Sequence, residues 1–381
     1  MEPVELSAEG LLLRAWQPED AMVIHRACQD PLIQRWTNIP VPYLPEHATL
    51  LINRLAPEGW RTGTSALFGV FEPMTEVLLG AHGLVHLDQA AGVAEMGTWT
   101  VPWARNRRVA ERATRAVARW ALDVLDLRQL VWRVELGNHV SRLVAERVGF
   151  VFDAPARGLI VGRNHDLSDG WRGTLRPGEI RSAPTPWLAP DGPGARRAKV
   201  FSAPQPRVPA GAATLRALAI ADIEPMILAC SDPMSVQWTN VAVPFTHAEA
   251  EASVRVFAPR RWARGEGAVF AIADGTDRFA GRIDLHISWE DPLIGSIGFL
   301  VSPEARGLGL ATAAVRALCE WGFAALGLAR IEWQAHTGND ASLRVAQKAG
   351  FTSEGTHRAG SEQRGERRDA WCAALLPADL G

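Results

Sequence analysis

The chain has 381 residues, which is too long for one ordinary hydrophobic core and suits two domains with a connector. Its 40 basic and 42 acidic side chains leave a formal net charge of −2, so composition indicates neither a nucleic acid nor a charged membrane surface as a partner. No stretch reaches the roughly 18 uninterrupted apolar residues of a membrane span, and the first ten residues lack a signal-peptide pattern; we therefore expect a cytoplasmic protein that binds no membrane.

A long sequence repeat divides the chain. The stretch "DPLIQRWTNIPVPY" from Asp30 recurs as "DPMSVQWTNVAVPF" from Asp232, and later landmarks such as Trp132 and Trp333 recur at a shift of 201. This spacing indicates duplication of a whole domain, because repeats that stack as solenoids are far shorter. We predict an N-terminal domain at 1–175 and a C-terminal domain at 211–381, which we expect to pack together; the oligomeric state stays open.

The predicted linker at 176–210 is rich in proline and glycine and shows neither helical nor strand periodicity. We expect an extended connector that packs over one domain. The alternative is a docking segment, because Trp187 is a large apolar residue to leave in solvent.

The elements of the second copy follow in chain order from periodicity and capping signals. Strands are predicted at 213–218, 268–274, 279–288, 295–302, 330–336, around 351 and at 370–376, and helices at 221–232, 246–257, 311–326 and 340–350. This mixture predicts an α/β (α+β) fold, with helices layered on a mixed sheet in each copy.

A glycine-rich turn joins the strand at 295–302 to the long helix that follows it. The segment reads "SPEARGLGLA", so Gly307 and Gly309 directly precede the helix start. A helix N-terminus presents unpaired N–H groups and a partial positive charge, and glycine lets backbone donors approach a phosphate closely. We expect Arg306 to add a charge-assisted bond.

These residues, with "NDAS" and "KAGF" about thirty residues later, resemble the GNAT superfamily of N-acetyltransferases, and most of all its ribosomal-protein N-terminal acetyltransferases. Arg306, Gly309 and Ala311 match the superfamily signature. The resemblance covers both copies and implies two tandem domains, each with a splayed mixed sheet and an acyl-coenzyme A site, without a metal. It implies that acetyl-coenzyme A or another acyl-coenzyme A binds at residues listed here: Phe299, Leu300, Val301, Arg306, Gly307, Leu308, Gly309, Leu310, Ala311, Thr312, Asn339 and Ser342.

The first copy departs from the signature. Arg108 stands where Gly309 stands in the second copy, beside Arg107. We expect the long side chain to fill the volume that the pyrophosphate needs, so that the first domain is degenerate and the second is catalytic. The alternative is that Arg107 and Arg108 pair with the phosphates themselves.

The catalytic groups are less clearly marked. The tyrosine that many members of the superfamily use corresponds to Ala346, which leaves Ser342 as the polar group near the sulfur; its alternative role, and that of Asn339, is capping. The acidic residue of related families is Glu95 in the first copy but Ser296 in the second. The remaining candidates for a base are listed as Asp284, His286, Glu332 and His336, although a lone histidine is often structural.

The acceptor side is predicted at the duplicated tryptophan stretch, where Trp238, Asn240 and Phe245 would line an amine pocket. The four cysteines lack metal-ligand spacing, so we expect no bound metal. The prediction is an acyl-coenzyme A dependent N-acyltransferase that acts on a primary amine of a small metabolite, an antibiotic or a peptide N-terminus. The alternatives are an enzyme that uses a long-chain or carrier-protein donor, and a non-catalytic acyl-coenzyme A scaffold or sensor.

Overall fold

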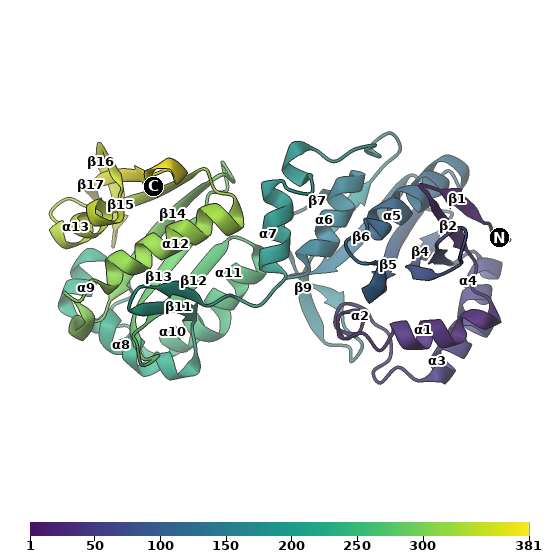
Figure 1. Ribbon diagram of the computed structural model, residues 1–381, viewed down its shortest axis with the longest axis horizontal. Coiled ribbons are helices and arrows are strands. Elements are labelled where there is room, and N and C mark those ends of the chain that lie inside the picture. The colour runs from purple at the N-terminus through teal and green to yellow at the C-terminus, as the bar shows by residue number, and fades with distance from the viewer. Residues whose placement is uncertain (381) are drawn as a thin grey trace. The chain divides into compact units, whose positions relative to one another are not determined.

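The computed structural model describes residues 1–380 and divides into two compact units, with Met1–Pro190 as unit 1 and the chain from Asp191 onward as unit 2. The division lies inside the linker predicted at 176–210. Each unit holds one mixed β-sheet with helices packed on it, as predicted (Figure 1). Within the described residues, no helix is both long enough and apolar enough to cross a membrane.

Unit 1 contains a nine-stranded sheet in the order β1-β2-β3-β4-β5-β6-β9-β7, with β8 beside β9. Its strands are β1 (Leu6–Ala8), β2 (Leu11–Arg14), β3 (Ala66–Phe71), β4 (Leu78–Asp88), β5 (Val93–Thr100), β6 (Gln129–Glu135), β7 (Val151–Phe152), β8 (Ala156–Val161) and β9 (Leu167–Leu175). Its α-helices are α1 (Ala21–Ala27), α2 (Pro31–Trp36), α3 (Pro45–Leu50), α4 (Ala56–Thr62), α5 (Val109–Arg119) and α6 (His139–Val148).

Unit 2 contains an eight-stranded sheet in the order β10-β11-β12-β13-β14-β15-β17-β16. Its strands are β10 (Val208–Ala210), β11 (Ala213–Ala217), β12 (Gly267–Ala273), β13 (Phe279–Ile287), β14 (Ile294–Val301), β15 (Arg330–His336), β16 (Thr352–Gln363) and β17 (Glu366–Leu375). Its α-helices are α7 (Pro193–Phe201), α8 (Ile223–Ser231), α9 (Pro233–Trp238), α10 (His247–Ala252), α11 (Ala258–Arg264), α12 (Leu310–Leu326) and α13 (Asp340–Ala349).

Local sequence signals explain where the helices of unit 2 begin. The Thr246 hydroxyl accepts a hydrogen bond from the Glu249 N–H, and the Glu249 carboxylate accepts one from the Thr246 N–H, which forms a capping box at the start of α10. A π-helical segment, Ser253–Phe257, then continues α10 into α11. Helix α9 was not predicted; it is a short helix capped by Asp232, whose carboxylate accepts from the Ser235 N–H.

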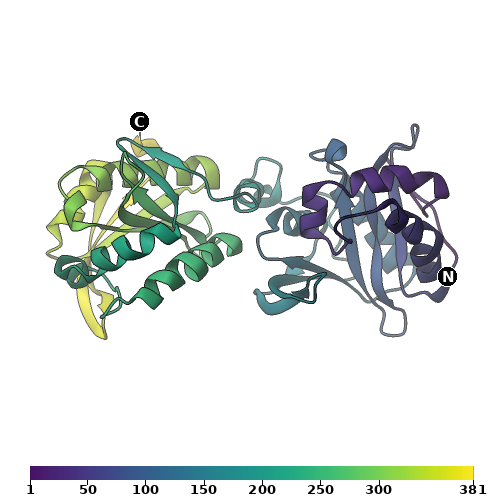
Figure 2. The same cartoon turned by 90° about the horizontal axis from the view of Figure 1, so that it is seen from below.

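Two apolar layers cover the two faces of the unit 2 sheet. On one face α12 contributes Val315 and Leu318, which belong to the same buried cluster as Ile283 and Leu285 of β13. On the other face α8 and α10 form a smaller cluster, which includes Met226. Seen from below, the teal and green helices of this second face lie in front of the sheet (Figure 2). Helices therefore pack on both faces of the central strands of this sheet.

The central strands of unit 2 separate after a short parallel pairing. Strands β14 and β15 pair from Ile294 with Arg330 to Ile297 with Trp333, and the pairing stops there. Strand β14 continues to Val301 beside β13, and β15 continues to His336 beside β17. The four residues of β14 beyond Ile297 therefore keep one edge of their backbone free of β15. This is the splay that the sequence resemblance implied.

Part of the predicted linker is helical. Helix α7 buries Phe201, whose ring packs edge-on against Trp262 at a centroid distance of 4.8 Å. The Arg197 guanidinium donates to the carbonyl oxygen of Leu326 at 2.9 Å, and burial lowers its pKa to about 10. This helix was not predicted, because the surrounding segment is rich in proline and glycine and because only the inward face of the helix is apolar. The segment is thus an integral part of unit 2.

We expect Phe201→Ala to lower the free energy of unfolding of unit 2 by about 3–5 kcal/mol, because it removes a ring that is 2% exposed. Chemical denaturation of the full chain, followed by tryptophan fluorescence, measures this change. Lys199→Ala, on the exposed side of the same helix, is the matched control. Equal effects of the two substitutions would contradict the packing role of α7.

Candidate active site

The glycine turn of unit 2 exposes the start of α12. Gly307 and Gly309 adopt left-handed backbone conformations with φ of 78° and 77°, and an added Cβ at either residue would meet no atom within 4 Å. In the described part of the chain, no side chain caps this helix. The first-turn N–H groups of a 17-residue helix therefore face open space with a partial positive charge, which suits a phosphate group.

Strand β14 leads directly into this turn, so one continuous segment carries most of the predicted coenzyme-binding residues. Phe299, Leu300 and Val301 lie in its splayed part, beyond the last pair with β15. Leu310 is buried in the core and Leu308 is 67% exposed, so both can serve a ligand mainly through their backbone groups. Ala311 and Thr312 follow in the first turn of α12. Because Gly307 and Gly309 have no side chains, the turn leaves room for a bulky anionic ligand.

The Arg306 side chain is engaged differently from the expectation. Its guanidinium donates to the Asp232 carboxylate at 2.5 Å and to the Ser235 hydroxyl at 3.3 Å, which ties the turn to the start of α9. Unit 1 repeats this contact with Arg105 and Asp30. Arg306 therefore anchors the loop through its Nη2 group, and a contact of the same side chain with a phosphate stays a prediction.

Asp284 lies over the point where β14 and β15 separate. It pairs across the sheet with Gly298, and a Cβ on Gly298 would stand 3.5 Å from the Asp284 carboxylate. Arg282 and Arg261 approach this carboxylate at 3.5 and 3.8 Å. These contacts hold Asp284 electrostatically, yet within residues 1–380 its carboxylate accepts no hydrogen bond, so it keeps the capacity to accept one from a ligand.

Ser342 and Asn339 form one structural unit at the start of α13. The Asn339 side chain accepts from the Ser342 N–H at 3.2 Å, and the Ser342 hydroxyl accepts from the Trp333 indole at 3.1 Å. Unit 1 has the same arrangement, with Ser141 bonded to Trp132. Asn339 therefore caps α13, whereas the Ser342 hydroxyl holds the Trp333 indole and still has its own proton to donate.

The other candidates for a base occupy different places. His336 lies at the end of β15; it is 7% exposed, and burial followed by the nearby Arg368 charge lowers its pKa, so it is neutral near pH 7. Its buried Nδ1 has no hydrogen-bond partner among the described residues. Glu332 pairs with Arg330 at 2.8 Å, and exposed Ser296 lies between Glu332 and His286 on the neighbouring strands. Of these groups, Asp284 alone stands over Gly298.

The predicted acceptor residues separate into three environments. The Trp238 ring lies 3.5 Å from where a Gly338 Cβ would stand, beside the turn after β15. Asn240 donates to the Glu362 carbonyl at 2.9 Å and lines a hollow with that residue. Phe245, in contrast, is partly buried and packs against the apolar cluster under α8 and α10.

The arginines of α11 and β13 were missed by the sequence analysis. Arg261 and Arg264 lie on α11, and together with Arg282 they line a pocket on the same face of the sheet as Asp284. The signal was the stretch "RRWAR", but such a run normally indicates a solvated helix face. No set of His, Cys, Asp and Glu side chains in the described chain could hold a metal ion.

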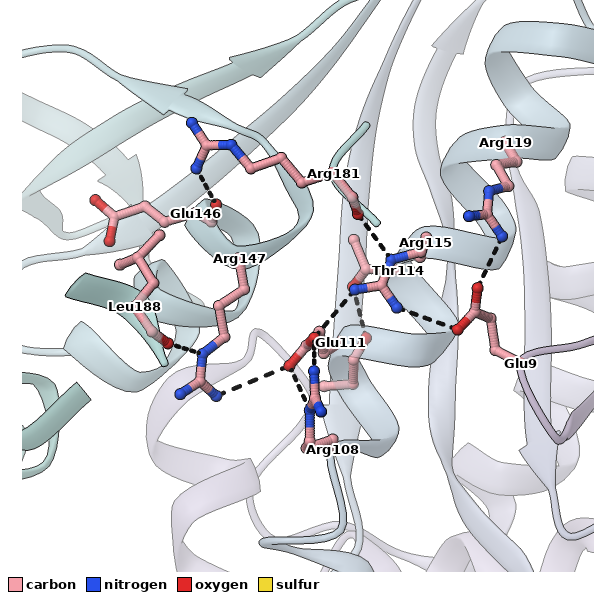
Figure 3. A network of polar contacts seen from close by, with 11 residues as sticks. Glu9, Arg108, Glu111, Thr114, Arg115, Arg119, Glu146, Arg147, Arg181 and Leu188 are labelled. Atoms are coloured by element: carbon pink, nitrogen blue, oxygen red, sulfur yellow. Dashed lines mark hydrogen bonds and ion pairs between the residues drawn. The ribbon is translucent and has the colours of Figure 1, made fainter. Parts of the chain in front are cut away.

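The same helix start in unit 1 is filled by an ion-pair network (Figure 3). Arg108 takes a left-handed conformation with φ of 55° and folds back onto Glu111, with a contact of 2.5 Å. Arg115 also pairs with Glu111 at 3.0 Å and with Glu9 at 3.1 Å. Arg107 pairs with Glu72 at 3.1 Å. Both arginines that could have bound phosphate are thus paired within the chain, and a carboxylate already lies in the first turn of α5.

Glu111 is the centre of this network. It is 1% exposed; burial acts to raise its pKa, but hydrogen bonds from Arg108 and Arg115 outweigh burial and lower the pKa below its ordinary value of 4.5. The charged form is therefore stabilised by folding, and this stabilisation is present above about pH 4.5 and lost as the pH falls through the lowered pKa.

We expect Glu111→Gln to destabilise unit 1 by about 1–3 kcal/mol at pH 7, because it removes one of the two carboxylates that pair with the buried Arg115 and leaves Glu9 as the other. Thermal unfolding of the full chain at pH 7 and at pH 3 measures this. The difference between variant and parent should be smaller at pH 3 than at pH 7, because the stabilisation by the Glu111 charge decreases below about pH 4.5. A difference that stays constant with pH would show that the charge of Glu111 does not stabilise the fold.

Comparison with known proteins agrees with this geometry. The family model described as an acetyltransferase (GNAT) domain matches residues 10–151 and 213–352. The uncharacterised N-acetyltransferase p20 of Bacillus licheniformis is 26% identical over 164 residues, which are 43% of this chain and 92% of that protein. YdaF of Bacillus subtilis (strain 168), provisionally named a ribosomal N-acetyltransferase, is 36% identical over 92 residues, which are 24% of this chain.

The matched region spans 50% of YdaF, so the chain aligns with half the length of that relative. The solved structure of RimJ from Mycobacterium smegmatis in complex with CoA-disulfide is similar with a TM-score of 0.41 and 24% identity, and covers 46% of this chain and 86% of that one. The two family matches together span well over half of the sequence. The chain belongs to the GNAT acetyltransferase family and contains two copies of its domain in tandem.

Proposed function

We propose that unit 2 is an acyl-coenzyme A dependent N-acetyltransferase, and that unit 1 binds no coenzyme. The observation that carries this proposal is the continuous path in unit 2 from the splayed part of β14 to the uncapped start of α12. Unit 1 has the same splay, because β5 and β6 pair only from Val93 to Glu95, but its helix start holds the Arg108–Glu111 pair.

Two backbone segments of unit 2 would bind two different parts of the coenzyme. The first-turn N–H groups of α12 would hold the pyrophosphate, and the free backbone edge of β14 would hold the amides of the pantetheine arm. When bound, the coenzyme supplies an acyl thioester. Gly309 leaves the room that this requires, as the open space around its missing Cβ indicates.

Asp284 is our candidate for the group that receives the amine. Its carboxylate stands over Gly298 and can accept a hydrogen bond from an ammonium group, then receive its proton directly or through water. The neutral amine forms the new C–N bond as the C–S bond breaks; the new amide nitrogen then loses one proton to solvent, and the departing thiolate takes one up. The Ser342 hydroxyl is proposed to pass that proton to the sulfur and to regain one from solvent, and N–H groups of Phe299 to Val301 would stabilise the carbonyl oxygen.

The acceptor is a primary amine on a small metabolite, an antibiotic or a peptide N-terminus. The provisional name of YdaF keeps a peptide amine among these candidates. The acyl group is taken to be acetyl, in line with the names of the relatives.

We expect Gly309→Arg to abolish coenzyme binding and acetyl transfer while unit 2 still folds. Arg108 shows that an arginine fits this position of the fold, at the cost of about 1–2 kcal/mol for a left-handed conformation. Calorimetric titration of the full chain with acetyl-coenzyme A should give one site in the parent and none in the variant. Two sites falling to one would mean that unit 1 also binds the coenzyme.

We expect Ser342→Ala to lower kcat about tenfold with little change in the KM for acetyl-coenzyme A, because the hydroxyl is proposed to act on the leaving sulfur. The substitution also removes the acceptor of the Trp333 indole, which should cost about 1–3 kcal/mol of stability. Ser141→Ala is the matched control, because it removes the same contact in unit 1 and should leave kcat unchanged. Equal turnover in the two variants would mean that the Ser342 hydroxyl has a structural role only.

A further inference from the structure

A basic pocket lies beside Asp284 on the face of the unit 2 sheet that α8 and α10 cover. Its volume is about 380 Å³. It is lined by Phe257, Arg260, Arg261, Arg264, Glu266, Val269 and Arg282. Val269 pairs directly with Asp284 across β12 and β13, so the pocket and the proposed amine position are neighbours on one surface.

The charges of the pocket are unbalanced. Arg261, Arg264 and Arg282 line it with one carboxylate, Glu266, which Arg264 approaches at 3.4 Å. Even when the adjacent Asp284 is counted, one positive charge of these three arginines remains in excess. The Arg264 Nε is buried and has no hydrogen-bond partner in the described chain. The contacts of Arg261 and Arg282 with Asp284, at 3.8 and 3.5 Å, are too long to satisfy their guanidinium donors. These arginines would therefore bind an anionic group of a ligand favourably, in addition to the carboxylates of Glu266 and Asp284.

Unit 1 offers an internal comparison. The C-cap glycines Gly63 and Gly265 end corresponding helices, and Ala66 pairs with Leu84 as Ala268 pairs with Leu285, which aligns the two units position by position. The residues at the positions of Arg261, Arg264, Arg282 and Asp284 are Gly59, Thr62, Ala81 and Gly83. The basic pocket thus occurs only in the unit whose helix start is open.

We propose that the acceptor of unit 2 is an amine that also carries an anionic group, a carboxylate or a phosphate, which Arg261, Arg264 and Arg282 bind while Asp284 holds the amine. Guanidinium groups bind both anions through paired charge-assisted hydrogen bonds. Arg261 lies 3.8 Å from Asp284, so the amine and the anion are only a few covalent bonds apart in the acceptor. The inference rests on the proposed acetyl transfer and narrows its substrate class.

Matched amines test the proposal with the full chain and acetyl-coenzyme A, with release of free thiol as the readout. The pairs are O-phosphoethanolamine against ethanolamine, and glycine against glycinamide. We expect kcat/KM to be about tenfold or more higher for at least one anionic member than for its neutral partner. A larger kcat/KM ratio in the first pair would indicate that the arginines bind a phosphate, and a larger ratio in the second pair would indicate a carboxylate.

The double variant Arg261→Gln, Arg282→Gln should remove this preference by raising the KM for the anionic amine about tenfold or more relative to its neutral partner, while leaving the KM for acetyl-coenzyme A unchanged. Arg264→Gln alone should act in the same direction, and it removes no hydrogen bond of its Nε. Arg278→Gln is the control, because Arg278 is 79% exposed and pairs with Asp274 in a turn. Asp284→Asn should lower kcat about hundredfold, because it removes the proposed proton acceptor.

Calorimetric titration of the full chain with O-phosphoethanolamine and with glycine measures binding without turnover. Binding that is lost in the double variant supports the proposal. If no amine releases thiol and this arginine-dependent binding is still found, acetyl transfer fails and the anion site stands. Equal kcat/KM values within both pairs, or a preference that the double variant leaves unchanged, would overturn the proposal.

Discussion

The parallel pairing of β14 with β15 over only four residues is the constraint on which the site of unit 2 depends. Each strand has a second neighbour, β13 for β14 and β17 for β15, and these antiparallel ladders continue after the parallel pairing ends. The outer antiparallel ladders therefore fix the separation of β14 from β15 beyond their last pair. This opening frees a backbone edge, aims β14 at the glycine turn, and leaves Asp284 over exposed backbone at Gly298.

The two units share the contacts that hold this architecture and differ in the charges around it. Both tie the turn to a helix start through an arginine and an aspartate, and both hold a tryptophan with a serine hydroxyl. Unit 2 adds open backbone at Gly309 and positive charge near Asp284, whereas unit 1 adds a buried carboxylate with its own arginines. The duplication has thus kept one scaffold with two electrostatic patterns.

Local signals allowed much of this to be predicted from sequence. The helix that follows Thr246 and the glycine turn at Gly309 depend on residues close together in the chain, so capping and backbone rules identify them. The partner of Arg306 lies 74 residues away, and the arginine pocket depends on the register of β12 with β13, which periodicity does not define. The packing of Phe245 likewise depends on tertiary contacts with the cluster of α8 and α10. Helix α7 was missed because its proline-rich surroundings are typical of a linker.

The Glu111 carboxylate shows how a binding site can be converted into a fixed part of a fold. The start of α12 has no counter-ion of its own, so any anion that it holds can exchange with solvent. The start of α5 has a counter-ion that is covalently part of the chain and cannot leave. Removing the Arg108 side chain alone would expose Glu111, whose charge repels phosphate. Recovery of coenzyme binding in unit 1 would therefore require coordinated replacement of Arg108, Glu111 and the buried Arg115, a route on which each single step costs stability.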